Sequence, residues 1–276
     1  EVTEYKARVI FLCASTLGST QLMMQSTSER FPNGFANASG ELGHNLMDHL
    51  FNMLSFADFP GDEDKYYTGQ KPGGIYIPRF RNVWDKHPDF VRGYGFQGNG
   101  SRGGWEGGKN QPGIGADFKN SLMMPAPWKM AMYGFGEILP YHDNKIELNK
   151  DKTDIYGLPT LHISTKHGEN EAAMKKDILA TAAEMLEAAG GKNIYQIDGK
   201  APMGSGIHEM GTARMGKDPK TSVLNKWNQC HEAKNVFVTD GSCMTSASCV
   251  NPSLTYMALT ARAVDYAVKE LNKQNL

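Results

Sequence analysis

The two ends of the chain share one hydrophobic pattern. Residues 8–15 read RVIFLCAS, a continuous apolar run that is typical of a strand covered on both faces of a parallel sheet. Residues 16–20 then predict a tight turn, and residues 21–26 have helical spacing. Near the other end, residues 235–239 read NVFVT and predict a second buried strand that ends at Asp240. Strand, turn and helix together form half of a doubly wound α/β unit.

A long helix is predicted after Asn251 and is expected to reach about Leu271. Pro252 suits the first helical position, because an N–H group has no partner inside the helix at that point. Apolar residues then recur at helical spacing and predict one buried stripe. Its members are Leu254, Met257, Ala258, Ala261, Val264 and Val268.

The middle of the chain, from about residue 50 to residue 199, has a different pattern. Segments such as GGIYIPRF and KIELNK alternate between apolar and polar residues and lie between Gly, Pro, Asp and Asn, which indicates antiparallel strands. Residues 93–115 are rich in glycine and predict a long ordered loop, because their aromatic side chains need something to pack on. A helix is predicted over 171–189, with Asn170 as its N-cap.

The expected fold class is therefore α/β plus α+β. The first and last segments would form one sheet-and-helix domain, and the antiparallel middle would be inserted into it. The length of 276 residues suits one large or two modest domains.

The composition of the chain argues against several classes of function. A net charge of −1 gives no electrostatic footprint for nucleic acid or for an anionic membrane surface. A mean hydropathy of −0.47, with no long apolar run, excludes a membrane-spanning helix. The four cysteines form no CxxC pair and no metal-ligand spacing, so no metal is expected. Nothing decides between a periplasmic and a cytoplasmic location.

Two familiar motifs are incomplete. Residues 211–217 match the first seven positions of a phosphate-binding P-loop, but Asp218 stands where Ser or Thr would bind magnesium. His208-Glu209 begins a zinc-binding HExxH motif, but Thr212 replaces the second histidine. Nucleoside triphosphate binding and zinc-dependent proteolysis are both excluded on these grounds.

The densest group of chemically useful residues is HEMGTARMG at 208–216, followed by Asp240-Gly241 and Asn251-Pro252. A reaction that removes a proton needs a base, and histidine, with a pKa of about 6.5, is the side chain that titrates nearest neutral pH. Asn251 has an amide that can bind a substrate oxygen as charge develops on it. Simpler roles stay open: His208 as a structural hydrogen-bonding group, and Asn251 and Asp240 as caps. We favour structural roles for His44 and His49.

Three motifs, in the same order, resemble the glucose-methanol-choline (GMC) oxidoreductases. The first is ARVIFLCASTLGSTQLM at 7–23, similar to a strand and turn of that family. The second is GHNLMDH at 43–49, similar to GxNLxDH. The third is HxxGTxxMG at 208–216 with the later Asn-Pro, where NPSLT is closest to the sugar-oxidising branch that includes pyranose oxidase and gluconate dehydrogenase-like subunits.

The resemblance implies an FAD-dependent oxidoreductase that oxidises a CH–OH group of a sugar or polyol by hydride transfer to the flavin. His208 would match the catalytic base, and Asn251 its partner. The expected cofactor-binding residues are Asp240 and Gly241 beside the ribityl and phosphate part, with Asn251, Pro252 and Leu254 near the isoalloxazine.

The resemblance also implies domains. Residues 1–49 and 217–276 would be the C-terminal part of the FAD-binding, Rossmann-like domain, and residues 50–216 the substrate-binding domain. The spacing GxGxxG occurs only at 93–98 and 98–103, inside the glycine-rich stretch and not between a strand and a helix, so the fingerprint for the ADP part of FAD is absent. We therefore expect a fragment that alone binds FAD weakly or not at all, with an N-terminal FAD-binding chain or a small subunit as partner.

The alternative is a protein without catalysis. Aromatic side chains such as Tyr94, Trp105 and Trp128 can stack on sugar rings, so a carbohydrate-binding module stays open. A structural subunit of a two-chain complex is the third hypothesis.

Overall fold

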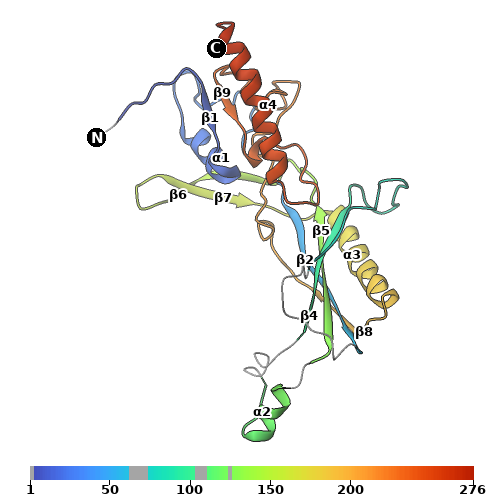
Figure 1. The fold of residues 1–276 in the computed structure, drawn as a ribbon. Helices are drawn as coiled ribbons and strands as arrows, with labels where there is room; N and C mark the ends of the chain where they lie inside the picture. The colour runs from blue at the N-terminus through green and yellow to red at the C-terminus, as the bar shows by residue number, and fades with distance from the viewer. Residues whose placement is uncertain (1–2, 62–73, 103–110, 124–125) are drawn as a thin grey trace. The chain divides into compact units, whose positions relative to one another are not determined.

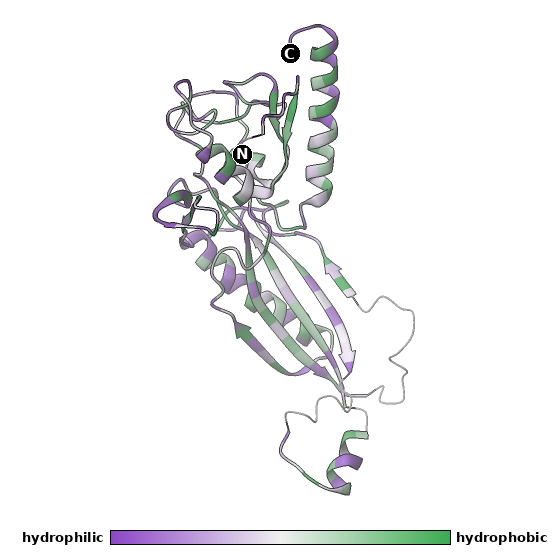
Figure 2. Cartoon of the chain, turned by 90° about the vertical axis from the view of Figure 1, so that its left-hand side faces the viewer, coloured by the Kyte–Doolittle hydropathy of each residue, from purple (hydrophilic) through white to green (hydrophobic). Residues whose placement is uncertain are grey.

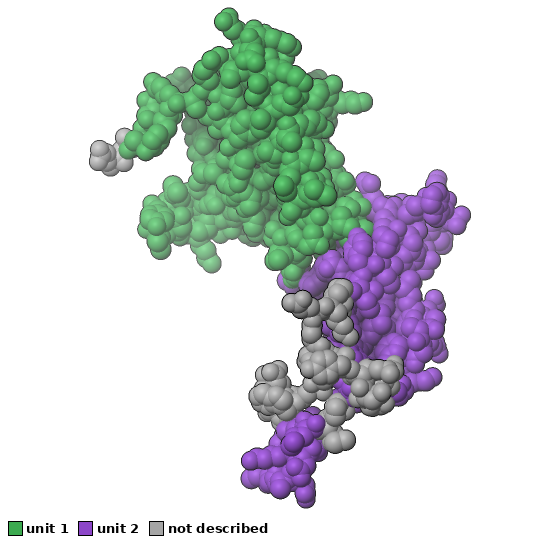
Figure 3. Space-filling model, viewed as in Figure 1, with its two compact units in different colours: residues 1–49, 137–168, 203–276 green, residues 50–136, 169–202 purple. Residues whose placement is uncertain are grey.

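The computed structural model describes residues 3–61, 74–102, 111–123 and 126–276 (Figure 1). The chain divides into two compact units (Figure 3): residues 1–49, 137–168 and 203–276 form unit 1, and residues 50–136 and 169–202 form unit 2. The expected fold class, α/β plus α+β, is confirmed. The compact units divide the chain differently from the expected domains, because residues 137–168 and 203–216 group with the two ends. The assignment of cofactor and substrate binding to domains stays a prediction.

Unit 1 contains a two-stranded parallel sheet. Strand β1 (Ile10–Leu12) pairs with β9 (Val236–Val238), as the sequence predicted for the two ends of the chain. Successive side chains of β9 point to opposite faces. Val236 and Val238 join a core that includes Met23 of α1 (Ser15–Gln25), whereas Phe237 packs with Ala263 and Ala267 of α4 (Ser253–Asn272).

Further segments of unit 1 bring two of the motifs together. The backbones of Met47 and Met210 exchange hydrogen bonds of 2.8 and 2.9 Å, which places GHNLMDH beside HEMGTARMG. Strands β6 (Lys145–Thr153) and β7 (Pro159–Ser164) form an antiparallel hairpin. The N–H of Ile146 on β6 donates to the carbonyl of Gly43 at 2.9 Å, so the hairpin is tied to the same segment.

Unit 2 is built on a five-stranded sheet with the order β3-β4-β5-β2-β8, as predicted for the middle of the chain. Helix α3 (Glu169–Ala188) packs on this sheet at glycines of β5. A Cβ at Gly134 would lie 2.2 Å from Ile178, so only glycine allows this close approach. The remaining elements are β2 (His49–Phe59), β3 (Gly74–Ile77), β4 (Tyr94–Arg102), β5 (Trp128–Glu137), β8 (Lys192–Asp198) and α2 (Ala116–Met123).

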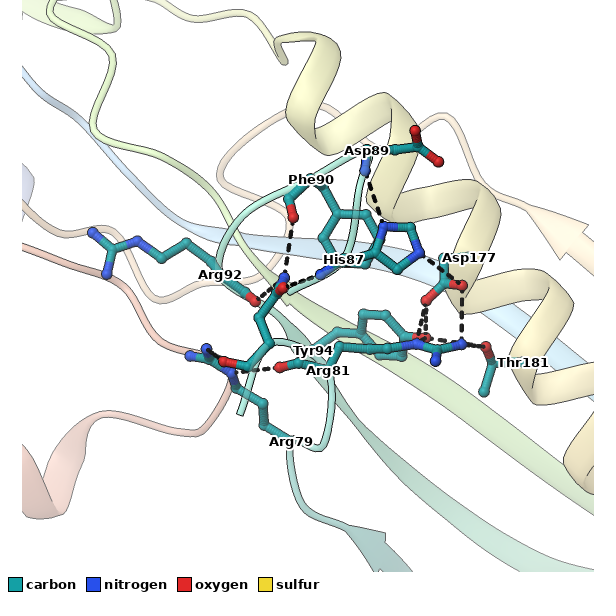
Figure 4. A network of polar contacts seen from close by, with 10 residues as sticks. Arg79, Arg81, His87, Asp89, Phe90, Arg92, Tyr94, Asp177 and Thr181 are labelled. Atoms are coloured by element: carbon teal, nitrogen blue, oxygen red, sulfur yellow. Dashed lines mark hydrogen bonds and ion pairs between the residues drawn. The ribbon is translucent and has the colours of Figure 1, made fainter. Parts of the chain in front are cut away.

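A network of polar side chains fastens α3 within unit 2 (Figure 4). Arg81 donates two hydrogen bonds, of 2.7 and 3.1 Å, to the carboxylate of Asp177. The hydroxyl of Tyr94 donates to the same carboxylate, and the ring of His87 lies 3.7 Å from it. Burial, followed by the hydrogen bond with Asp177, raises the pKa of Tyr94 to about 12.

The predicted buried stripe of α4 is wrong. All six of its residues are exposed: Leu254, Met257, Ala258, Ala261, Val264 and Val268. The helix instead packs through Ala263 and Ala267, which are 0 % and 3 % exposed and let its backbone approach Phe237. Periodicity detects an apolar face but cannot tell which of two such faces meets the sheet.

Two predictions near the N-terminus also fail. Residues 16–20 belong to α1 rather than to a turn, because the chain reverses at Ser15, which has a φ of 67° and begins the helix. The strand is shorter than predicted and not covered on both faces, since Ile10 is 45 % exposed.

Two predictions in the middle fail as well. The expected loop over 93–115 contains strand β4, and residues 103–110 lie outside the described residues. Glycines in β4 carry no alternation signal, so the pairing with β5 was invisible in the sequence. Asn170 does not cap α3, which begins at Glu169; its side-chain oxygen accepts a hydrogen bond of 2.8 Å from the N–H of Val91.

Candidate active site

The loop before His208 is shaped by one buried carboxylate. Asp48 has 0 % exposure. It accepts hydrogen bonds from four backbone N–H groups: His49 (2.7 Å), Gly204 (2.9 Å), Gly206 (2.9 Å) and His208 (3.2 Å). A Cβ at Gly206 would lie 2.6 Å from this carboxylate, so a larger residue would push the loop away. Because a buried charge is tolerated only when it is hydrogen-bonded, Asp48 fixes the backbone of His208.

The ring of His208 is held beside a second imidazole. Its centroid lies 4.9 Å from that of His49, with the planes at 79°, an edge-to-face contact. Among the described residues, the buried Nδ1 of His208 has no hydrogen-bond partner. A polar atom left in this way costs about 1–3 kcal/mol and is a common feature of functional sites.

His49 is held in its neutral form. Burial, followed by the neighbouring His208, lowers its pKa. Its Nδ1 lies 3.1 Å from the carbonyl oxygen of Ser248; since a carbonyl can only accept, this nitrogen carries the proton. His49 is therefore part of the His208 environment, which the sequence analysis did not anticipate when it favoured a structural role.

An open pocket of about 390 Å³ lies next to His208 in unit 1. Its lining comes from four segments far apart in the sequence: 13–16, 207–209, 240–241 and 252–256. His208, Asp240, Gly241 and Pro252 all contribute to it. The fold therefore brings together four of the six residues singled out from the sequence.

Asp240 closes one side of the pocket and is 9 % exposed. One oxygen of its carboxylate accepts from the N–H and the hydroxyl of Ser242, at 2.9 and 2.6 Å, and the other accepts from the hydroxyl of Ser19. It thus caps the 3₁₀ helix η2 (Gly241–Cys243) and ties it to α1. A Cβ at Gly241 would lie 2.5 Å from both the carbonyl of Glu209 and the hydroxyl of Thr16, so the position requires glycine.

The N-terminus of α4 forms another side of the pocket. Pro252 is buried and stands directly before the helix. Tyr256 also lines the pocket, and burial raises the pKa of its hydroxyl. The first N–H groups of a helix attract electron-rich groups, so this end suits an anionic or electron-rich ligand.

Asn251 and Leu254 are the two singled-out residues that do not belong to the pocket lining. Asn251 is exposed and directly precedes Pro252. Leu254 is 78 % exposed on the first turn of α4. The site also contains residues that the sequence analysis did not single out: Thr16, which lies inside the motif at 7–23, and Tyr256, which directly follows NPSLT.

The aromatic side chains described in unit 2 do not favour the alternative of a carbohydrate-binding module. Tyr94 is 0 % exposed and cannot present its ring to a sugar. Trp128 is half-buried, and the guanidinium of Arg102 lies 5.9 Å from its ring centre. Trp105 lies outside the described residues.

Comparison with known proteins identifies the site's family. Residues 140–260, which include His208, Asp240 and Pro252, match the family model described as GMC oxidoreductase. Residues 140–260 form a GMC oxidoreductase C-terminal domain. It is 31 % identical to the 2-methyl-1,2-propanediol dehydrogenase of Mycolicibacterium austroafricanum, over 95 % of this chain and 48 % of that protein.

Two further relatives match this chain over a similar share of their length. The chain is 28 % identical to the fructose dehydrogenase large subunit of Gluconobacter japonicus, over 97 % of this chain and 48 % of that protein. It is 25 % identical to the gluconate 2-dehydrogenase flavoprotein of Pantoea cypripedii, over 92 % of this chain and 43 % of that protein. The chain thus spans about half the length of the curated relatives it matches.

A solved structure supports the fold alone. The formate oxidase of Aspergillus oryzae RIB40 aligns with a TM-score of 0.60 at 13 % identity, over 96 % of this chain and 55 % of that one. In the described part of the chain, no helix combines the length and apolar character needed to cross a membrane. The same residues hold no cluster of three or more His, Cys, Asp or Glu side chains suited to a metal ion.

Proposed function

We propose that this chain is the part of an FAD-dependent GMC oxidoreductase that carries the catalytic base, and that the whole enzyme oxidises a CH–OH group of a sugar or polyol. The observation that carries the proposal is the pocket in which His208, Asp240, Gly241 and Pro252 lie together. The named reactions of the relatives support it, since 2-methyl-1,2-propanediol, fructose and gluconate all contain hydroxyl groups.

The pocket has the chemistry that a flavin needs. Its walls combine the N-terminal turn of α4 with the Asp240 carboxylate, which can accept hydrogen bonds from ligand hydroxyl groups. His208 lines the same pocket, and its buried Nδ1 has no hydrogen-bond partner among the described residues. Bound FAD would supply the hydride acceptor. In this proposal Asp240 and Gly241 flank its ribityl and phosphate part, and Asn251, Pro252 and Leu254 lie near the ring system.

His208 then acts as the base. It takes the proton from the substrate hydroxyl while the carbon gives up its hydride, because an imidazole titrates close to neutral pH. Asp48 holds the backbone of His208, and the neutral His49 packs against its ring without adding a positive charge that would oppose proton uptake. Asn251 assists by donating a hydrogen bond to the substrate oxygen.

We further propose that a second polypeptide, or a preceding part of the same one, completes the flavin site. A half-site makes half of the contacts, so this chain alone should bind FAD weakly or not at all. Two of the relatives are named as a large subunit and as a flavoprotein, which supports an enzyme built from several subunits.

Titration with FAD tests the cofactor part of the proposal. The purified chain is mixed with FAD, with and without the half of the Mycolicibacterium relative that it does not match, then desalted and scanned for flavin absorption. We expect a retained band only in the mixture. The variant Asp240→Ala should lose most of that band, whereas Asp143→Ala, at an exposed carboxylate of the same unit, should keep it. A mixture that never retains flavin, although the two halves assemble, would contradict the proposal.

A further inference from the structure

The pocket beside His208 carries negative charge without a matching cation. Two carboxylates line it, those of Glu209 and Asp240, and its lining within the described part of the chain contains no lysine or arginine. Charges of one sign in a concave site attract ligand groups of the opposite sign and repel groups of the same sign. A ligand that enters this pocket therefore meets net negative charge.

The two carboxylates of the pocket differ in how they are occupied. One oxygen of Asp240 accepts hydrogen bonds from Ser242, and the other accepts one from Ser19. The half-buried side chain of Glu209 makes no hydrogen bond or ion pair with any residue that the structure describes. Because a carboxylate removed from bulk water is stabilised by a partner, Glu209 is the one of the two that is open to a ligand.

The backbone of Glu209 is held in place from three sides. Its carbonyl oxygen accepts a hydrogen bond from the hydroxyl of Thr16 on α1. The N–H groups of His208 and Met210, on either side of it, donate to residues 47–48 at 3.2 and 2.9 Å. The fold therefore fixes this free carboxylate directly after the proposed catalytic base.

The pKa of Tyr256, on the first turn of α4, reflects the same negative charge. Burial is the largest cause of its raised pKa, Cys243 is the next, and the two carboxylates of the pocket add to it. Its hydroxyl, which makes no hydrogen bond with a described residue, keeps its proton and offers a donor. The pocket thus presents one free acceptor and one free donor, which is what a hydroxyl-rich ligand needs.

We infer that Glu209 determines which class of substrate the pocket takes: its carboxylate accepts a hydrogen bond from a hydroxyl near the one that is oxidised, or pairs with an ammonium group there. The inference rests on the proposed function and adds the kind of sugar or polyol. Neutral and cationic polyols fit this pocket. A sugar acid such as gluconate is disfavoured, because its carboxylate is repelled by that of Glu209.

Three small diols that differ in charge test the inference. Glycerol, glycerate and 3-amino-1,2-propanediol share a 1,2-diol, and their third group is neutral, anionic and cationic. The chain is assembled with the unmatched half of the Mycolicibacterium relative and FAD, and kcat/KM is measured for each diol. Dissociation constants are measured in His208→Gln from the change in flavin absorption, so that binding is read without turnover.

We expect the wild-type site to favour the amine over glycerate by at least about tenfold in both quantities. Glu209→Gln should remove most of this preference and change glycerol by less than about twofold, because the amide still accepts a hydrogen bond but has no charge. Glu29→Gln, at an exposed carboxylate of the same unit, is the matched control and should keep the wild-type preference. Both variants should keep the melting temperature and the flavin retention of wild type.

Three results would overturn the inference. Glu209→Gln keeps the wild-type preference, or the wild-type site binds glycerate as tightly as the amine, or it binds none of the three diols. Oxidation that depends on His208 but not on Glu209 would remove this inference and leave the proposed function. Binding in the expected order without oxidation of any diol would support the charge selection and contradict the proposed function instead.

Discussion

Two carboxylates, one in each unit, have different hydrogen-bond partners and different structural roles. Asp177 is paired with side chains, including a two-bonded contact with Arg81 and the hydroxyl of Tyr94 (Figure 4). Asp48 accepts only backbone N–H groups in the contacts that hold its loop. In the first arrangement, no buried polar side-chain atom of the described residues lacks a partner. The second arrangement fixes a loop and leaves the Nδ1 of His208 without a partner.

The difference between these two regions indicates which of two pockets is the candidate active site. A larger pocket, of about 630 Å³, lies beside Asp177 in unit 2, where Arg81 and His87 both contact the Asp177 carboxylate. The pocket beside His208 is smaller, about 390 Å³, and His208, which lines it, has a buried Nδ1 without a hydrogen-bond partner among the described residues. The kind of side chain at a pocket, here a histidine suited to act as a base, points to a functional site better than pocket size does. Four changes test this contrast.

The largest effect is expected at His208. In the assembled enzyme, His208→Gln should lower kcat by about 10²–10⁴-fold, because a general base contributes about that much to the rate. Steady-state oxidation of a polyol measures it. His162→Gln, at an exposed histidine on β7, is the control and should leave kcat unchanged. Similar activity in both variants would remove His208 from the mechanism.

Asp177→Ala should affect stability instead. The change leaves Arg81 and Tyr94 without their shared acceptor, and it should cost about 3 kcal/mol in the free energy of unfolding. Urea denaturation measures this loss. Flavin retention by the assembled protein should not change below the unfolding midpoint. A loss of flavin without a loss of stability would make unit 2 the functional side of the comparison.

Asp48→Asn should loosen one loop. The amide replaces an acceptor with a donor among four N–H groups, at a cost of about 2 kcal/mol. Hydrogen exchange of the amides at 204–208 should speed up, while the exchange of α3 amides stays the same. Equal changes in both places would show that Asp48 supports the whole fold rather than the His208 loop.

The smallest effect concerns the pH dependence of stability. Because the pKa of His49 is lower in the folded protein, the unfolded state binds its proton first as the pH falls. This part of the stability is therefore present above about pH 6.5 and lost below it. Unfolding free energies at several pH values should fall less steeply for His49→Gln than for wild type on the acid side. A steeper fall would contradict the assignment of a neutral His49.

Parts of this account could be predicted from the sequence because they depend on local chemistry. The strand before Asp240 and the helix after Pro252 follow from apolar runs and from proline's missing N–H. The role of Asp48 could not, since three of its four donors lie 156–160 residues away and are backbone groups. The buried face of α4 was misjudged because its larger apolar stripe, which includes Leu254 and Met257, is exposed (Figure 2).

Anaerobic reduction of the bound flavin tests the central claim most directly. The chain is assembled with the unmatched half of the Mycolicibacterium relative and FAD, oxygen is removed, and 2-methyl-1,2-propanediol, fructose or gluconate is added. The account predicts that at least one of them bleaches the visible flavin band, and that His208→Gln slows the bleaching without loss of bound FAD. A flavin that stays bound and oxidised with all three, or that bleaches equally fast in His208→Gln, would contradict it.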